Sequence, residues 1–249
     1  MASQESGIRK RDLHSLPNLF TGMNLISGGL AVFALITKFD FIVPFCICFS
    51  LVCDFFDGFV ARKMQIQSNI GKELDSLADV ISFGLVPSVM ILRMFNPDMM
   101  IRLDLSSILL FVLPFTIAFY SALRLAKFNL ETRDSEYFYG LNTPSNTIMI
   151  LGIFLTYNQG HFGFIDLMEN NIALLVGFLV IINYLLISNT PMFSNKSIKK
   201  QFKGNIPFLI IGIIGLISIL FLGYLGISIA ILSYVLLSLL TLRFKMIRF

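Results

Sequence analysis

Four aspartates lie close together in a part of the chain that is otherwise strongly apolar. Asp54 and Asp57 are three residues apart, and Asp75 and Asp79 are four residues apart. On helices, each pair would project from a single face. An ionised aspartate at bilayer depth costs roughly 2.5 to 3.5 kcal/mol, so such groups usually face an interior cavity that holds a partner. The spacing therefore predicts two helix ends whose carboxylates face each other and require a cation.

The residue types around these acids indicate which cation and which ligand would bind. Carboxylate oxygens suit a hard divalent ion such as Mg²⁺ or Mn²⁺, and four aspartates can hold two ions. Gly58, Ala61 and Gly71 would let a bulky group approach the backbone. Arg62 offers a planar fork for phosphate oxygens. The stretch is therefore predicted to bind metal ions and phosphate together.

The elements that must position these residues are membrane-spanning helices. Hydrophobic residues make up 56% of the 249 residues and the mean hydropathy is +0.81, which excludes a soluble globular protein. Long continuous apolar runs in lipid form helices. We therefore expect an all-α, polytopic integral membrane helical bundle with about eight transmembrane helices. The expected spans are residues 16–37, 41–59, 75–95, 105–125, 143–157, 171–189, 206–222 and 224–241.

The distribution of basic residues predicts the orientation of the chain. If the N-terminus is cytoplasmic, only Lys38, Arg93 and Arg102 of the 19 Lys and Arg residues fall on the outer side. This positive-inside bias places both termini and the four aspartates on the cytoplasmic side of a bacterial-type cell membrane. Anionic membrane lipids account for the basic loops, so no nucleic-acid partner is expected.

The first expected helix carries a polar stripe, defined by Asn18, Thr21 and Asn24 at intervals of three residues. On an otherwise apolar membrane helix such a stripe points toward the bundle interior. Two interpretations are open: the stripe makes hydrogen bonds between helices, or it contacts a ligand.

The whole acidic stretch resembles a family signature. From Asp54 to Asp79 the chain reads Asp-x2-Asp-Gly-x2-Ala-Arg-x8-Gly-x3-Asp-x3-Asp, which fills all eight fixed positions of the CDP-alcohol phosphatidyltransferase motif. Acids that merely cap helix ends at the membrane surface would explain one pair, but neither the small residues nor the register of both pairs. The resemblance implies a core of six helices, in which metals grip the pyrophosphate of CDP-diacylglycerol and an alcohol displaces CMP.

The resemblance also assigns roles to individual residues. Asp79 would act as the general base toward the alcohol and in part as a metal ligand. The metal ligands would be Asp54, Asp57, Asp75 and Asp79, and CDP-diacylglycerol would contact Asn18, Thr21, Asp54, Gly58, Ala61, Arg62 and Gly71.

Two further segments are similar to the phosphatidylserine synthase branch of the family. They are Asp-Ser-Leu-Ala-Asp-x2-Ser-Phe-Gly, which begins at Asp75, and Ala-Leu-Arg-Leu-Ala-Lys-Phe-Asn at residues 122–129. This similarity implies L-serine as the acceptor, with serine or phosphate contacts from Ser82, Arg124, Lys127 and Asn129. Arg124 and Lys127 would equally serve as positive-inside anchors that snorkel to the surface.

One segment departs from that branch. Residues 140–146 resemble its Gly-Leu-Pro-x-Pro segment, but Asn142 replaces the first proline. Ser145 and Asn146 stand where the branch has small apolar residues. Independently of any family, Pro144 is well placed to start a helix.

Other functions and the domain organisation complete the expectations. Glycerol 3-phosphate or inositol are alternative acceptors, and a divalent-cation transporter is an alternative class, since intramembrane acids fit both. We expect an interfacial arm at residues 1–15, the catalytic membrane core at 16–189, and two additional helices with a basic tail at 190–249. Glycines in these last helices suit close helix contacts or a homodimer: Gly212, Gly215, Gly223 and Gly226.

Overall fold

The computed structural model describes residues 15–65, 68–95, 105–130, 138–160, 163, 167, 171–193 and 206–246. These residues are mostly helical, and the chain divides into two compact units, Met1–Ser82 (unit 1) and Phe83–Phe249 (unit 2). The predicted arm, except for Ser15, and the last three residues of the basic tail lie outside the described residues.

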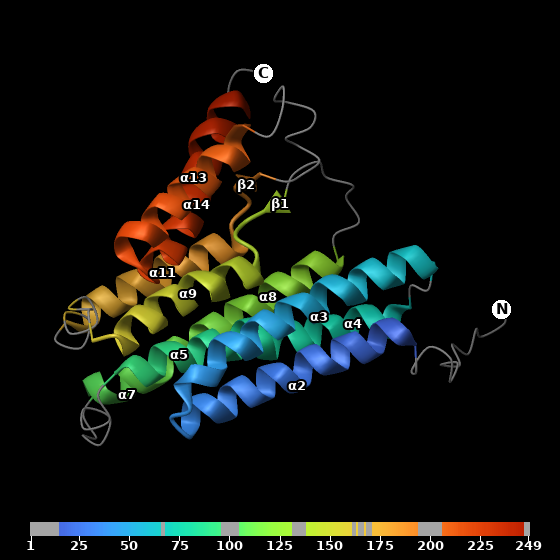
Figure 1. Ribbon diagram of the computed structural model, residues 1–249, viewed down its shortest axis with the longest axis horizontal. Helices are drawn as coiled ribbons and strands as arrows, with labels where there is room; N and C mark the ends of the chain where they lie inside the picture. Colours follow the sequence, from blue (N-terminus) through green and yellow to red (C-terminus); the bar gives the residue numbers. More distant parts are fainter. Residues whose placement is uncertain are drawn as a thin grey trace. The chain divides into compact units, whose positions relative to one another are not determined.

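The described residues of unit 1 form three α-helices and one 3₁₀ turn. Helix α2 lies along α3 and also contacts α4 (Figure 1). Pro17 stands at the start of α2, where its missing N–H costs no hydrogen bond. The bounds are α2 Leu16–Ile36, the 3₁₀ turn η1 Asp40–Ile42, α3 Val43–Met64 and α4 Asn69–Val80.

The connection between the two acidic helices is shorter than the sequence suggested. The predicted spans end at residue 59 and begin again at residue 75, whereas α3 runs on to Met64 and α4 begins at Asn69. Basic residues are favourable in the last turn of a helix, so the polar sequence does not end α3. The acids therefore lie within the helices, one to three turns from their ends. Local caps set the turn: Gln65 adopts a left-handed conformation (φ 55°), and the Ser68 hydroxyl accepts a hydrogen bond from the Gly71 N–H at 3.0 Å.

The third helical run continues from α4 through a π-helical segment, η2 (Ile81–Leu85), into α5 (Val86–Met94). Pro87 lacks an N–H, so the carbonyl of Phe83, four residues earlier, loses its helical partner. The Thr147 hydroxyl donates to that carbonyl at 3.1 Å. The proline thus lies beside an irregular turn, and a side chain from another helix satisfies the freed backbone group.

Unit 2 contains the remaining helices. Pro114 interrupts the fourth span with a 3₁₀ turn, η3, after which α8 extends five residues beyond the predicted end at Leu125. The Asn142 side chain caps α9 by accepting a hydrogen bond from the Ser145 N–H at 2.7 Å, with Pro144 in the first turn as predicted. The bounds are α7 Leu105–Val112, η3 Leu113–Phe115, α8 Thr116–Leu130, α9 Thr143–Asn158, α11 Ile172–Ile187, α13 Ile206–Leu222 and α14 Leu225–Met246.

Two short strands, β1 (Phe138–Tyr139) and β2 (Pro191–Met192), pair antiparallel in unit 2 and were not predicted. Gly140 follows β1 with φ 71°. A Cβ there would lie 2.9 Å from the carbonyl oxygens of Leu185, Leu186 and Ser188. Only glycine fits both this conformation and this close approach.

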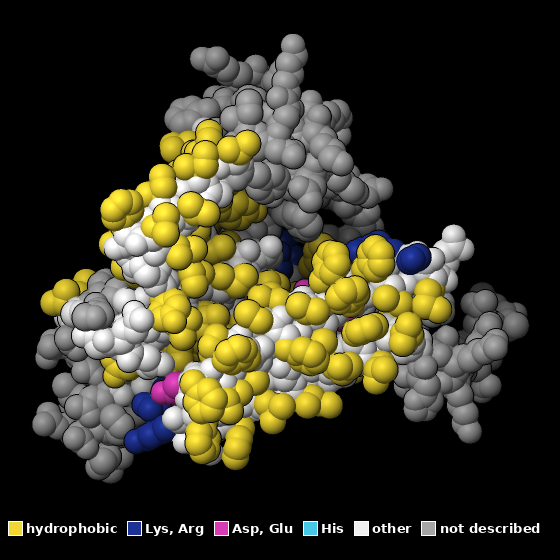
Figure 2. Space-filling model, viewed as in Figure 1, with side chains coloured by type: hydrophobic (Ala, Val, Ile, Leu, Met, Phe, Trp, Pro, Cys, Tyr) yellow, Lys and Arg dark blue, Asp and Glu magenta, His cyan; other side chains and the backbone are white. Residues whose placement is uncertain are grey.

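Within the described part of the chain, four helical runs are long and apolar enough to cross a membrane: Leu16–Ile36, Asp40–Met64, Asn69–Met94 and Ser107–Leu130. Helices α9, α11, α13 and α14 coincide with the other predicted spans. Large apolar side chains such as Ile26 and Phe45 are 65% and 71% exposed, and Figure 2 shows that apolar side chains cover much of the visible surface. A surface of this kind suits lipid. The chain is a polytopic integral membrane helical protein, as predicted.

The last two helices pack closely through their glycines. A Cβ on Gly215 would lie 3.0 Å from the Cβ of Ala230, and one on Gly226 would collide with the backbone at Ser218 and Ile219. The predicted close helix contacts are confirmed at these two positions, and the homodimer remains a prediction.

Candidate active site

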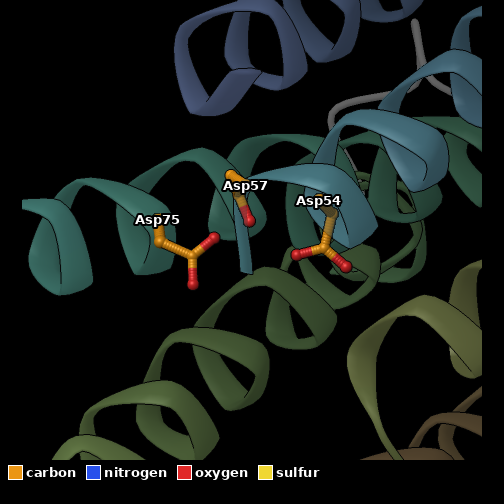
Figure 3. A group of neighbouring side chains, drawn as sticks. All are labelled: Asp54, Asp57 and Asp75. Atoms are coloured by element: carbon orange, nitrogen blue, oxygen red, sulfur yellow. The ribbon is translucent and has the colours of Figure 1, made fainter. Parts of the chain in front are cut away.

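Three of the four aspartates meet in unit 1. Asp54 and Asp57 project from α3 and Asp75 from α4, and one carboxylate oxygen from each lies within 4.8 Å of the others (Figure 3). Asp57 is only 5% exposed. The i, i+3 spacing places the first two on one face of α3, and the tight turn at Gln65 brings α4 back alongside them. The prediction that the two helices present their acids to each other is confirmed for these residues.

The chemistry of this acidic group fits a hard divalent cation. Its ligand atoms are all carboxylate oxygens, the donors that Mg²⁺ and Mn²⁺ prefer. The Asp75 Oδ1 atom is buried and has no hydrogen-bond partner in the part of the chain that the structure describes. Three carboxylates this close repel one another in an apolar surrounding unless a cation offsets their charge. The acidic group therefore has the properties of a metal site.

Asp79 is held differently from the other three acids. It lies one helical turn after Asp75 on α4 and is 7% exposed. Its Oδ1 atom accepts a hydrogen bond from the Asn24 side-chain amide at 3.1 Å. The structure thus separates the four acids into a group of three and a fourth that an amide orients.

Asn24 is in turn fixed by two other helical segments. It is fully buried, and its main-chain carbonyl accepts hydrogen bonds from the hydroxyls of Ser50, on α3, at 3.3 Å and Ser82, in η2, at 3.0 Å. Its Oδ1 atom has no hydrogen-bond partner among the described residues. The link from Asn24 to Asp79 was not predicted, although the polar stripe was the signal that would have located it.

The other two members of the polar stripe also lie against the acidic helices. The Thr21 hydroxyl donates to Asp57 Oδ2 at 2.9 Å. The Asn18 Oδ1 atom would lie 3.0 Å from a Cβ on Gly71, so the two residues are in close contact. Of the two interpretations of the stripe, hydrogen bonding between helices is therefore observed for Thr21 and Asn24. Contact of Asn18 and Thr21 with a nucleotide stays a prediction.

The sequence comparisons agree with this geometry. The sequence model of the CDP-alcohol phosphatidyltransferase family matches residues 14–182, about two thirds of the chain. The chain belongs to this family.

Three proteins similar to the chain are each named CDP-diacylglycerol–serine O-phosphatidyltransferase. The protein of Helicobacter pylori strain J99 is 32% identical over 194 residues, 77% of each chain. That of Methanocaldococcus jannaschii is 31% identical over 205 residues, 82% of this chain and 87% of the relative. That of Bacillus subtilis is 31% identical over 153 residues, 59% of this chain and 78% of the relative.

The small residues of the family signature line the helices near the acids. A Cβ on Gly58 would lie 3.4 Å from Nη1 of Arg62, so the guanidinium group runs back along α3 over this glycine. Ala61 is half-buried and Arg62 is exposed. Gly58 and Ala61 thus place no bulky side chain on α3 near the carboxylates, and the Arg62 guanidinium group lies next to Gly58. Gly28, which lies outside the signature, allows another close approach: a Cβ there would lie 2.9 Å from the Cα of Ser82.

The residues predicted to contact serine occur in both units. Ser82 belongs to unit 1, where its hydroxyl donates to Asn24. Arg124, Lys127 and Asn129 lie on α8 in unit 2. Arg124 and Asn129 are half-buried, whereas Lys127 is exposed and donates to Asn189 Oδ1 at 2.6 Å. Serine contacts from these four residues stay predictions.

Proposed function

We propose that this phosphatidyltransferase transfers the phosphatidyl group of CDP-diacylglycerol to the hydroxyl of L-serine, with phosphatidylserine and CMP as products. Family membership supports the reaction type, and the names of the relatives support serine as the acceptor. The observation that carries the proposal is the meeting of Asp54, Asp57 and Asp75 with Asp79 held beside them by Asn24.

The acidic group would hold the divalent metal, Mg²⁺ or Mn²⁺, and with Asp79 it offers enough carboxylates for two ions. A metal bound there would supply charge stabilisation for the pyrophosphate and for the CMP that leaves. The aspartates would hold the metal at a fixed place between two helices.

Asp79 is the residue that we assign as the general base. As the serine oxygen forms its bond to phosphorus and the bond to the CMP oxygen breaks, the hydroxyl proton must be taken up. Asn24 occupies one carboxylate oxygen of Asp79 and fixes its orientation, which leaves the second oxygen for the proton. A carboxylate that is oriented in advance loses little freedom when the substrate arrives.

The remaining signature residues would bind the substrates. Arg62 beside Gly58 suits the phosphates, because a guanidinium group pairs with phosphate oxygens in a planar fork. For the lipid-linked nucleotide we retain the contacts predicted from the sequence: Asn18, Thr21, Asp54, Gly58, Ala61, Arg62 and Gly71. For serine we retain Ser82, Arg124, Lys127 and Asn129.

We further propose that the protein resides in a bacterial-type cell membrane with the four aspartates on the cytoplasmic side. Lys63 at the end of α3 and Lys72 at the start of α4 support this orientation, since both lie at the end of the bundle where the acidic helices turn. Membrane lipids and a second copy of the chain are the expected partners. A nucleic-acid partner is not expected.

In the decisive experiment, the purified protein is placed in lipid nanodiscs and given CDP-diacylglycerol, Mg²⁺ or Mn²⁺, and one acceptor at a time. Serine should give phosphatidylserine and an equal amount of CMP, whereas glycerol 3-phosphate and inositol should give neither. Transfer to glycerol 3-phosphate without transfer to serine would show that the phosphatidylserine synthase branch is the wrong assignment. Manganese flux into liposomes without CMP release would instead indicate a transporter.

A further inference from the structure

Helix α14 holds the chain segment that follows α11 in unit 2. Tyr234 and Ser238 lie one turn apart on α14. The Tyr234 hydroxyl donates a hydrogen bond to the carbonyl of Phe193 at 3.0 Å, and the Ser238 hydroxyl accepts one from the N–H of the same residue at 3.3 Å. Both backbone groups of Phe193 are therefore bonded to side chains of α14. We refer to residues 188–193 as the post-α11 segment.

Apolar packing supports these two hydrogen bonds. Met192 in the post-α11 segment and Val235 on α14 are buried in one cluster with Leu141, and Tyr234 packs against it. Phe193 is itself only 3% exposed. Closely packed side chains have few alternative arrangements, so α14 determines where the post-α11 segment lies.

The post-α11 segment also carries the residue that holds a lysine of α8. Asn189 Oδ1 accepts a hydrogen bond from Lys127 Nζ at 2.6 Å. The neighbours of Asn189 are fixed on each side. The hydroxyls of Ser188 and Thr190 share a hydrogen bond at 2.6 Å, and the Thr190 carbonyl accepts one from the Gly140 N–H at 2.9 Å. A continuous series of contacts thus runs from α14 through the post-α11 segment to Lys127.

The contact with Asn189 orients Lys127 without neutralising its charge. An amide oxygen has no formal charge, and the hydrogen bond uses one of the three donors of the ammonium group. A lysine side chain is long and flexible, so a contact that orients it lowers the entropy lost when it binds an anion. Arg124, one turn earlier on α8, interacts electrostatically with Tyr234. Both basic residues therefore have a neighbour whose position depends on α14.

We propose that Tyr234 and Asn189 are positioning residues that hold Lys127, together with Arg124, for an anionic group of a substrate. This inference rests on the proposed function, in which Arg124 and Lys127 contact serine or phosphate, and it gives a role to α14. The anion is the serine carboxylate or a phosphate of CDP-diacylglycerol, because ammonium and guanidinium groups bind both. The post-α11 segment and α14 follow residue 182, where the match to the family model ends, so family membership does not assign this role.

Tyr234→Phe and Asn189→Leu test the series of contacts, with serine and CDP-diacylglycerol titrated separately. KM for the substrate that carries the anion should rise about 3- to 10-fold, the effect of one hydrogen bond, while kcat changes less than about twofold. A rise for serine identifies the carboxylate, and a rise for CDP-diacylglycerol identifies the phosphate. In a Lys127→Ala background, Asn189→Leu should have little further effect on KM, because both substitutions act through the same ammonium group.

The matched control is Ser228→Ala on the same helix. The Ser228 hydroxyl donates to the Met149 carbonyl at 2.6 Å and so joins α14 to α9 rather than to the post-α11 segment. This variant should have a lower melting temperature and unchanged KM for both substrates. Wild-type KM values in both Tyr234→Phe and Asn189→Leu, or an equal rise in Ser228→Ala, would overturn the positioning role. A wild type that uses glycerol 3-phosphate but not serine would instead overturn the proposed function.

Discussion

The buried polar side chains of unit 1 differ in their hydrogen bonding from three buried polar side chains on α8 and α9 of unit 2. In unit 1, Thr21, Asn24 and Ser82 each form a hydrogen bond to another helical segment. In unit 2, the side chains of Ser121, Thr143 and Asn146 form none with the residues that the structure describes. The bonded groups of unit 1 fix the position of the acids. Buried polar residues thus have a positioning role in unit 1 that these three residues of unit 2 do not share.

The largest expected effect distinguishes the role of the acidic group (Asp54, Asp57 and Asp75) from that of Asp79 within unit 1. Asp57→Ala removes a metal ligand, so turnover should fall more than about 1,000-fold and Mn²⁺ binding should weaken in calorimetry. Asp79→Asn removes the proposed base but keeps its shape, so turnover should fall about 10²- to 10⁴-fold. In that variant the binding of Mn²⁺ and CDP-diacylglycerol should be retained.

Calorimetry of both variants, together with CMP release in the presence of serine, checks this division. Near-normal turnover of Asp79→Asn would remove the base role. Loss of metal binding in Asp79→Asn would make this residue chiefly a ligand, and exhaustive chelation that leaves activity intact would exclude a metal-dependent reaction.

A smaller effect is expected from Asn24, which orients Asp79 without contacting substrate in our proposal. Asn24→Leu leaves the carboxylate without its amide donor, so kcat should fall about 10- to 100-fold with little change in KM for CDP-diacylglycerol. The melting temperature should also fall, because the buried carboxylate loses a hydrogen bond. Asn24→Ser retains a donor and should recover part of kcat.

The control for Asn24 is Ser27→Ala on the same helix. Ser27 donates to the Cys46 carbonyl at 2.8 Å and has no bond to the acids. Loss of the hydrogen bond from Ser27 to Cys46 should lower the free energy of unfolding by about 1 kcal/mol and leave kcat nearly unchanged. Equal loss of kcat in Ser27→Ala and Asn24→Leu would show that Asn24 acts only through stability.

Much of the acidic site follows from the sequence. The spacing of Asp54 and Asp57 determines that they share a helical face whatever surrounds them. The inward direction of the polar stripe also follows from its period and the apolar residues around it. The particular pairing of Asn24 with Asp79 does not, because it depends on how α2 crosses the third helical run.

The features that the sequence did not predict arise from local caps and distant contacts. Hydropathy marks where apolar sequence ends, but Ser68 starts α4 six residues before the predicted span. The pairing of β1 with β2 joins segments about 50 residues apart and involves only two residues of each. The unbonded state of Asn146 becomes visible only when its neighbours are known, since a polar residue on a membrane helix ordinarily finds a partner.

The smallest expected effect tests whether the satisfied polar region depends on close packing between helices. Gly28→Ala would place a methyl group 2.9 Å from the Ser82 Cα, a backbone atom that cannot move away alone. The helices must separate, so we expect a loss of about 1 to 3 kcal/mol of stability. When the helices separate, the hydrogen bond from Ser82 to Asn24 should weaken, and kcat should fall severalfold.

Gly29→Ala is the matched control, because no atom lies within 4 Å of its Cβ position. There the better helix propensity of alanine should raise stability by up to about 1 kcal/mol. Thermal unfolding of the two variants in the same detergent measures the difference, and equal melting temperatures would mean that the contact between Gly28 and Ser82 does not hold the site together.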